Sequence, residues 1–194
     1  MKIKSLLLIF LFSSCTGSLE PSELITWIET PENDCVQESE LSAFKLRASI
    51  LPSSLMAYKQ LHILQERYDD SAFDALEKEY QKGVYFKFSL DFSDSSQQAK
   101  SFFETHTDYL NFYIARDLFL IKGGDTLICS VANLERSANF TPHLNYELAF
   151  DTGEVPNENP QDLTLIYSGE LSENKPVTFL FTASAINDIP TLKR

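Results

Sequence analysis

Three cysteines, Cys15, Cys35 and Cys129, are the side chains of this sequence with the clearest capacity for covalent chemistry. Cys35 and Cys129 could form a disulfide, which an oxidising compartment permits, provided that their Cα atoms come within about 7 Å. Alternatively, Cys129 is a free thiol that packs as a small apolar side chain, since Leu127 and Val131 flank it at strand spacing. A nucleophilic role is disfavoured because no histidine lies near Cys129 in the sequence. Both the disulfide and the buried thiol remain open.

Glu135 and Arg136 form the most suggestive polar pair, at the end of a predicted strand. A guanidinium binds a carboxylate through two parallel hydrogen bonds, so Arg136 could hold an acidic side chain or a ligand. The structural ion pair is the favoured interpretation, and ligand contact is the alternative.

Metal and cofactor chemistry have little support in the sequence. His62, His106 and His143 are far apart, and no pair of cysteines or histidines has metal-ligand spacing. The chain has no phosphate-binding loop, no dinucleotide fingerprint and no nucleophile elbow. We therefore expect no metal, no cofactor and no enzymatic activity.

The N-terminus has the pattern of an export signal. Lys2 and Lys4 precede the seven apolar residues Leu6–Phe12, a run too short to span a bilayer and suited to a signal peptide. The run ends in Phe-Ser-Ser before Cys15, which resembles the lipobox of bacterial lipoproteins. The resemblance implies that Cys15 is acylated and becomes the mature N-terminus. The alternative is an ordinary signal peptide with an incidental cysteine.

This interpretation divides the chain into a lipoprotein signal peptide (1–14), a lipidated tether (15–20) and a single folded domain (21–194). Residues 16–20 reach at most about 17 Å when extended, so the domain would lie close to the membrane. Thr16 follows the cysteine in place of an aspartate that would signal inner-membrane retention. We expect a cell-envelope protein, an outer-membrane lipoprotein that faces the periplasm.

Composition narrows the classes of partner. The 194 residues have a formal net charge of −12, with 43% hydrophobic and 23% charged residues. An acidic chain of globular composition argues against nucleic-acid binding and against a basic membrane-binding surface. The membrane contact is expected to be the N-terminal lipid alone.

Hydrophobic periodicity predicts helices gathered in the first half of the chain, two strands among them, and only strands in the C-terminal third. Apolar residues at helical spacing predict helices over 21–30, from 53 or 54 to about 68, from Asp70-Ser71 to about 80, and over 94–104. Strict alternation predicts strands over 44–50, 84–92, 144–150, 163–167 and 177–183. Gly123 and Gly124 predict a two-residue hairpin turn that leads into a strand over 126–132.

These elements predict an α+β fold. The domain is expected to be an antiparallel β-sandwich or curled sheet with three to four short helices, helix-rich over 21–104 and β-rich over 110–194.

Three short segments resemble one group of proteins. Trp27–Asn33 (WIETPEN), Gly124–Cys129 (GDTLIC) and Ile186–Leu192 (INDIPTL) are similar to segments of a family of small uncharacterised Bacteroidetes-type outer-membrane lipoproteins. The resemblance implies placement in the cell envelope, with no assigned activity. Asp34 and Cys35 stand where that group has Gly-Leu, so the resemblance assigns no role to Cys35.

Two functions fit this sequence. The first is a lipid-anchored, non-catalytic interaction or assembly module that docks on another envelope protein. The alternative is a periplasmic or surface lipoprotein that binds a small ligand or glycan, for which Trp27, Tyr109, Phe112 and Tyr113 are stacking candidates.

Overall fold

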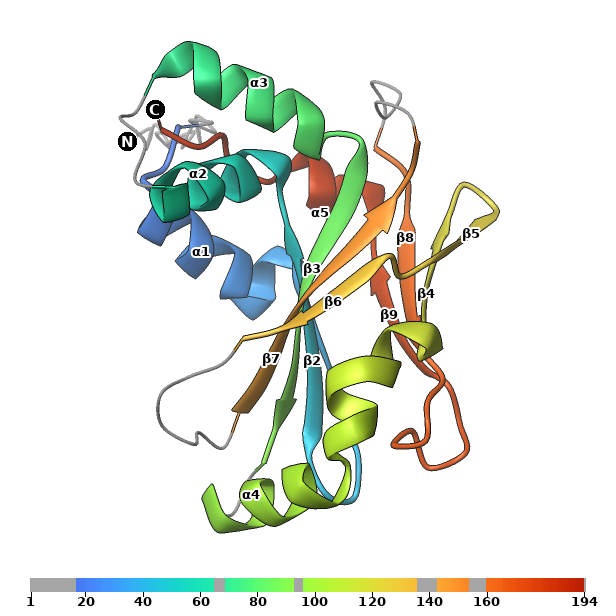
Figure 1. Cartoon of the computed structure of the whole chain (residues 1–194). Helices are drawn as coiled ribbons and strands as arrows, with labels where there is room; N and C mark the ends of the chain where they lie inside the picture. The colour runs from blue at the N-terminus through green and yellow to red at the C-terminus, as the bar shows by residue number, and fades with distance from the viewer. Residues whose placement is uncertain (1–16, 65–68, 93–95, 136–142, 154–159, 194) are drawn as a thin grey trace, which may run out of the picture.

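Two antiparallel β-sheets packed face to face form the centre of the molecule, and helices cover one of them (Figure 1). The computed structural model describes residues 17–64, 69–92, 96–135, 143–153 and 160–193. The larger sheet has the strand order β1-β2-β3-β7-β6 and the smaller one β5-β4-β8-β9. This arrangement confirms the predicted α+β sandwich class.

The described strands, in chain order, are β1 Val36–Glu40, β2 Lys45–Leu51, β3 Gly83–Asp91, β4 Leu118–Lys122, β5 Asp125–Ile128, β6 Val131–Leu134, β7 His143–Asp151, β8 Leu163–Tyr167 and β9 Val177–Phe181. The helical segments are α1 Pro21–Glu29, η1 Pro31–Asn33, α2 Ser53–Leu64, α3 Asp70–Tyr80, α4 Ser96–Thr105, the single-turn π-helix η2 Tyr109–Tyr113, η3 Ile114–Asp117 and α5 Ala183–Asn187.

Aromatic side chains from both sheets form the core between them. Phe86 and Phe88 alternate on β3 and face the smaller sheet, where the Phe86 ring lies 5.2 Å from Phe181 and the Phe88 ring 6.2 Å from Phe179, centroid to centroid. Burial of large rings supplies most of the stabilisation of such a core. The period-two pattern that predicted β3 therefore also identified its inward face.

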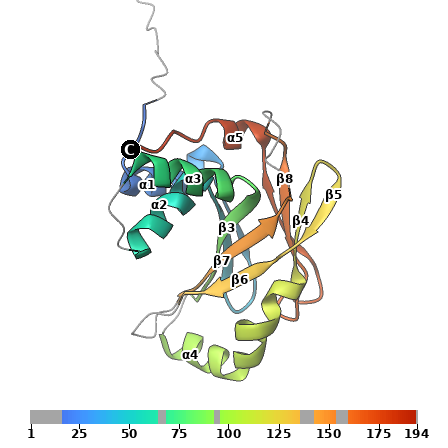
Figure 2. The ribbon, with the colours of Figure 1, turned by 45° about the horizontal axis from the view of Figure 1, so that its top comes forward.

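Helices α1, α2 and α3 cover one end of the outer face of the larger sheet, while α4 lies at the other end of the molecule (Figure 2). Pro21 begins α1, where a missing backbone N–H costs nothing, and Leu24 and Ile28 are its buried face. The helix α3 is capped by Asp69, whose carboxylate accepts a hydrogen bond from the Ser71 amide at 3.0 Å. The predicted start of this helix, at Asp70-Ser71, is therefore confirmed.

The segment predicted as one strand over 126–132 is instead divided between the two sheets. The Cys129 amide donates to the Leu118 carbonyl of the smaller sheet at 3.2 Å, and the next amide, Ser130, donates to Ala149 of the larger sheet at 2.8 Å. The chain thus leaves β5 and enters β6 between consecutive residues. Ile128 and Val131 on either side of this crossing are exposed, which corrects the expectation that Leu127, Cys129 and Val131 share one buried face.

Turn residues explain two other boundaries. Gly123 and Gly124 have φ values of +60° and +94°, which suits a two-residue hairpin and confirms the predicted turn between β4 and β5. The predicted strand over 177–183 ends at Phe181, because the Thr182 hydroxyl accepts a hydrogen bond from the Ala185 amide and begins α5.

Candidate functional site

The two cysteines in the described part of the chain do not form the disulfide that the sequence left open. Both are free and buried. Cys35 precedes β1, and its thiol lies 3.6 Å from the Ala185 carbonyl of α5, whereas the Cys129 thiol lies 3.0 Å from the Val131 carbonyl. Strands β1 and β5 are at opposite edges of the sandwich, which keeps the two thiols apart.

Burial makes both thiols poor nucleophiles. Removal from water raises the pKa of Cys35 to about 11, with the negative charges of Asp34 and Asp188 as smaller contributions. Removal from water likewise raises the pKa of Cys129 to about 11. At neutral pH both are protonated, so Cys129 fits the alternative of a small buried apolar side chain.

The other predicted site residues are only partly within the described structure. Cys15 and Arg136 lie outside the described residues. Glu135 is exposed at the end of β6, and its backbone amide donates to the Asn145 carbonyl at 2.8 Å.

Three of the candidate stacking aromatics, Tyr109, Phe112 and Tyr113, lie on η2, but Tyr109 is turned into the core and Trp27 lies on α1. Tyr109 is buried, and its hydroxyl donates to Asp117 at 2.8 Å. Phe112 is exposed, and the neighbouring ring of Tyr113 is covered by the Arg116 guanidinium at 4.2 Å from the ring centroid. Trp27 lies on α1 and is partly buried against the core.

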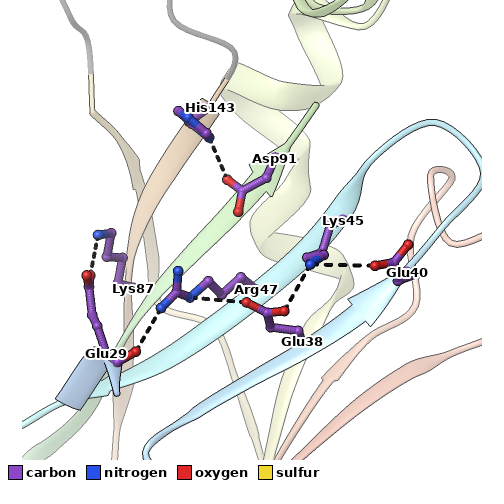
Figure 3. A network of polar contacts seen from close by, with 8 residues as sticks. All are labelled: Glu29, Glu38, Glu40, Lys45, Arg47, Lys87, Asp91 and His143. Carbon is purple, nitrogen blue, oxygen red and sulfur yellow. Dashed lines mark hydrogen bonds and ion pairs between the residues drawn. The ribbon is translucent and has the colours of Figure 1, made fainter. Parts of the chain in front are cut away.

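A network of charged side chains crosses the outer face of the larger sheet (Figure 3). Glu38 on β1 is paired in register with Arg47 on β2, and its carboxylate lies 3.7 Å from Arg47 Nε and 3.1 Å from Lys45 Nζ. Lys45 also lies 3.5 Å from Glu40, the residue directly opposite it. Both carboxylates raise the pKa of the Lys45 ammonium, and Glu38 makes the larger contribution.

The same network ties α1 to the sheet. The Lys87 ammonium donates to the Glu29 carboxylate at 2.7 Å, and Arg47 donates to the Glu29 backbone carbonyl at 3.1 Å (Figure 3). At the far end, His143 Nδ1 lies 3.0 Å from Asp91. Each charged group drawn there already has a partner of opposite charge or a carbonyl, so the network is a structural feature with no charge left for a ligand.

A cavity of about 580 Å³ lies at the end of the sandwich near α5. Strands of both sheets, the β4–β5 hairpin and the C-terminal tail contribute to its wall. Its main apolar lining residues are Leu51, Val84, Leu127, Leu163, Ile186 and Ile189, and its polar ones include Ser54, Gln81, Tyr85, Lys122, Asp125 and Gln161. The volume is typical of a small-molecule site, and polar and apolar residues contribute comparable shares of its lining.

Lys122 is the unusual side chain of this cavity. Leu118 and Leu120 are buried at alternate positions of β4, so Lys122 occupies the next inward-facing position of the same strand. Burial lowers the pKa of its ammonium, and no ion pair or hydrogen bond of its side chain is present in the described part of the chain. Among the described lysines, Lys122 alone is both partly buried and without an ion pair; Lys78 and Lys175 are unpaired but exposed.

Asp125 is directly opposite Lys122 at the base of the hairpin and also lines the cavity, but it is exposed and makes no ion pair with Lys122. Sequence analysis missed this site. The signal was present, however: a lysine continues the period-two series of Leu118 and Leu120, where an apolar residue is expected. A charged residue in an inward-facing strand position is a marker of function.

The described residues contain no group of three or more histidine, cysteine, aspartate or glutamate side chains placed to hold a metal ion. Within the same ranges, the helices are too short or too polar to cross a bilayer.

Comparisons with known proteins give no family. No family model matches the chain, and no curated protein is significantly similar to it. Among solved structures, the chain resembles a protein of unknown function from Burkholderia pseudomallei K96243 (TM-score 0.43, 10% identity), over 89% of this chain and 94% of that one. It also resembles a DUF4426 family protein from Pseudomonas aeruginosa PAO1 (TM-score 0.34, 8% identity), over 76% of this chain and 91% of that one. Likeness at this level carries no conclusion about function.

Proposed function

We propose that this chain is a lipid-anchored protein of the cell envelope whose folded domain binds a small ligand, without catalysis, in the cavity at the end of the sandwich. The observation that carries the proposal is the unpaired, partly buried ammonium of Lys122 in the wall of a cavity of about 580 Å³. Of the two functions that fit the sequence, this geometry favours ligand binding over docking.

Partial burial disfavours the charged form of Lys122. Moving an ammonium group out of water has a free-energy cost unless an opposite charge or hydrogen-bond acceptors replace the water. Its register partners, Asp125 and Leu163, supply no compensating contact within 4 Å. A ligand that brings an acceptor to Lys122 would recover that free energy as binding affinity.

The location of the protein is part of the proposal. The charged N-terminus, the apolar run Leu6–Phe12 and Cys15 support export and acylation, and the short tether supports a position close to the membrane. We place the protein at the outer membrane, on the periplasmic side.

A thermal-shift screen tests the binding function. The mature chain, residues 15–194 with Cys15→Ser to prevent acylation, would be screened against small metabolites and amphiphiles. A ligand at 100 times its Kd stabilises the folded state by about 2.7 kcal/mol. We expect saturable stabilisation by one chemical class, and mass spectrometry should recover the ligand unchanged.

A matched pair of variants locates the site. Leu127 lines the cavity, whereas its neighbour Ile128 is exposed. Leu127→Trp should fill part of the cavity and abolish the shift, and Ile128→Trp should leave it intact. A shift that survives Leu127→Trp, or a screen without any stabilising compound, would contradict the proposal.

A docking role on another envelope protein is the second candidate. Ile128, Val131 and Phe112 are 66%, 52% and 71% exposed, a high exposure for large apolar side chains. A pull-down from detergent-solubilised envelopes, with the full-length protein compared with Cys15→Ala and Val131→Ser, tests it. Recovery of one stoichiometric partner that Val131→Ser loses would support docking.

A further inference from the structure

The C-terminal tail of the domain joins the cavity to the N-terminal tether. The Leu19 amide donates to the Thr191 carbonyl at 2.9 Å, and the Lys193 amide donates to the Leu19 carbonyl at 2.7 Å, as a parallel bridge. The Lys193 ammonium also donates to the Glu20 carboxylate at 2.6 Å. Thr191 and the preceding Ile189 and Pro190 line the cavity.

This bridge fixes how far the cavity can be from the anchor. Leu19 is four residues after Cys15, a span of at most about 14 Å in a fully extended chain. If Cys15 is acylated, the tail that forms one cavity wall lies within about that distance of the lipid surface. This proximity favours a ligand that comes from the membrane.

The lining of the cavity indicates which membrane component fits. Leu51, Leu127, Leu163, Ile186 and Ile189 offer apolar surface that an acyl chain can cover. Lys122 offers one positive charge without a partner in the described structure, and charge-assisted hydrogen bonds to carboxylate or phosphate are about twice as strong as neutral ones. A sugar, whose surface consists mainly of hydroxyl groups, would by contrast leave much of this apolar surface without apolar contacts.

We propose that the ligand is a single-chain amphiphile with an anionic head group, taken from the membrane, whose head group pairs with Lys122 and whose chain lies against the apolar lining. This inference rests on the proposed binding function and names its ligand class. The shared chemistry is one acyl chain with one anionic head, which a fatty acid or a lysophospholipid with a terminal phosphate can supply.

Calorimetry with amphiphiles of one chain length and different head groups tests the ligand class. The mature chain with Cys15→Ser would be titrated, below the micellar concentration, with dodecanoate, with dodecanoyl lysophosphatidate, with the neutral monododecanoylglycerol and with the cation dodecyltrimethylammonium. We expect the two anions to bind at least tenfold more tightly than the neutral and cationic compounds. The stronger anion identifies the source as a fatty acid or a lysophospholipid.

Substitutions of Lys122 test whether the anionic head group pairs with this side chain. Lys122→Gln should weaken anion binding by about tenfold to a hundredfold, as expected for a lost hydrogen bond to a charged group, and leave the neutral compound unaffected. Lys122→Arg should restore most of the loss. Lys175→Gln is the matched control, because Lys175 is unpaired, exposed and not part of the cavity lining.

The outcomes separate this inference from the proposed function. Equal affinity for all four head groups, or an anion affinity that Lys122→Gln does not lower, would overturn the anionic head group. If no amphiphile binds but the metabolite screen yields a ligand that Leu127→Trp excludes, the binding function stands and this inference fails. If nothing binds in either experiment, both fail.

Discussion

The hydroxyl groups of Tyr109 and Tyr167 lie 2.9 Å apart in the interior of the domain, where they connect the π-helix η2 to the end of β8. Tyr109 also donates to the Asp117 carboxylate at 2.8 Å, and Tyr167 accepts a hydrogen bond from the Leu171 amide at 3.3 Å. Burial is the main cause that raises the pKa of Tyr109, and it raises that of Tyr167 to about 12. Both phenols are therefore protonated at neutral pH. One hydroxyl group can then donate a hydrogen bond to the other.

Tyr109→Phe is expected to destabilise the domain by about 1–3 kcal/mol, because Asp117 and Tyr167 each lose a hydrogen-bond partner. Gly169→Ala should cost a similar amount, since a Cβ at this position would overlap the Tyr109 hydroxyl. In the double variant the overlap with the Tyr109 hydroxyl is relieved, while the close approach to Tyr167 at 2.7 Å remains, so the combined loss should be smaller than the sum. Urea unfolding of the four proteins measures this coupling, and strictly additive losses would contradict the close approach.

Phe88→Ala is expected to lower the free energy of unfolding by about 3–5 kcal/mol. Phe88 is fully buried, and its ring lies within 6.5 Å of Tyr146, Tyr167 and Phe179, centroid to centroid. The control is Leu180→Ala, next to Phe179 on β9 but 52% exposed, which should change stability by no more than about 0.5 kcal/mol. Chemical denaturation measures the free energy of unfolding of both variants. Equal losses of stability would contradict the position of Phe88 in the core.

Lys122→Met is expected to stabilise the unliganded domain by about 0.5 kcal/mol at neutral pH, since it removes a partly buried charge that solvent still screens. The pKa of Lys122 is lower in the folded protein than its ordinary value of 10.5. Between these two values the unfolded chain binds more protons, so the contribution of Lys122 to stability rises with pH through that window. The stability difference between Lys122→Met and the unmodified domain should therefore shrink as the pH approaches 10.5. A difference that is constant with pH would contradict a burial effect.

The two buried thiols are expected to resist alkylation. In the mature chain with Cys15→Ser, iodoacetamide at pH 8 should label Cys35 and Cys129 only after unfolding, because both thiols are protonated and covered. A reducing agent should leave the melting temperature unchanged, since the structure has no bridge between them. Mass spectrometry of native and denatured samples gives the result, and rapid native labelling would contradict the burial.

The same cysteines are expected to lower the stability of the domain at alkaline pH. Their pKa is about 11 in the folded state against an ordinary value of 9.0. Between these values the folded protein holds protons that the unfolded chain has released, so stability falls as the pH rises through this window. The double variant Cys35→Ala with Cys129→Ala should show a smaller fall than the parent chain in denaturation measured from pH 8.5 to 11.

Periodicity predicted the elements that have a strong apolar stripe. Strand β3 and helix α3 were predicted within a few residues because Phe86, Phe88 and Phe73 recur at strand or helix spacing. Strand β1 (Val36–Glu40) escaped prediction, because its sequence, Val-Gln-Glu-Ser-Glu, is polar and its edge position requires little burial.

The candidate site was hidden for a different reason. A cavity forms where segments distant in sequence meet, here the ends of β2 and β3, the β4–β5 hairpin and the C-terminal tail. Sequence pattern gives the face of Lys122 on its strand, but not whether a neighbour covers it or a space opens beside it. The same limit applied to Cys35 and Cys129, whose separation depends on strand order in two sheets.

The crossing between Cys129 and Ser130 has a mechanical consequence. Consecutive amides bind different sheets there, so along the β5–β6 edge the two sheets cannot separate without breaking backbone hydrogen bonds. At the opposite edge, β1 and β9 pack against each other without ladder pairing, and side-chain hydrogen bonds such as Ser42 to Glu173 and Cys35 to Ala185 connect the two sides. The continuous backbone therefore fastens the two sheets to each other at this edge, near residue 129, whereas side-chain contacts hold them together at the other.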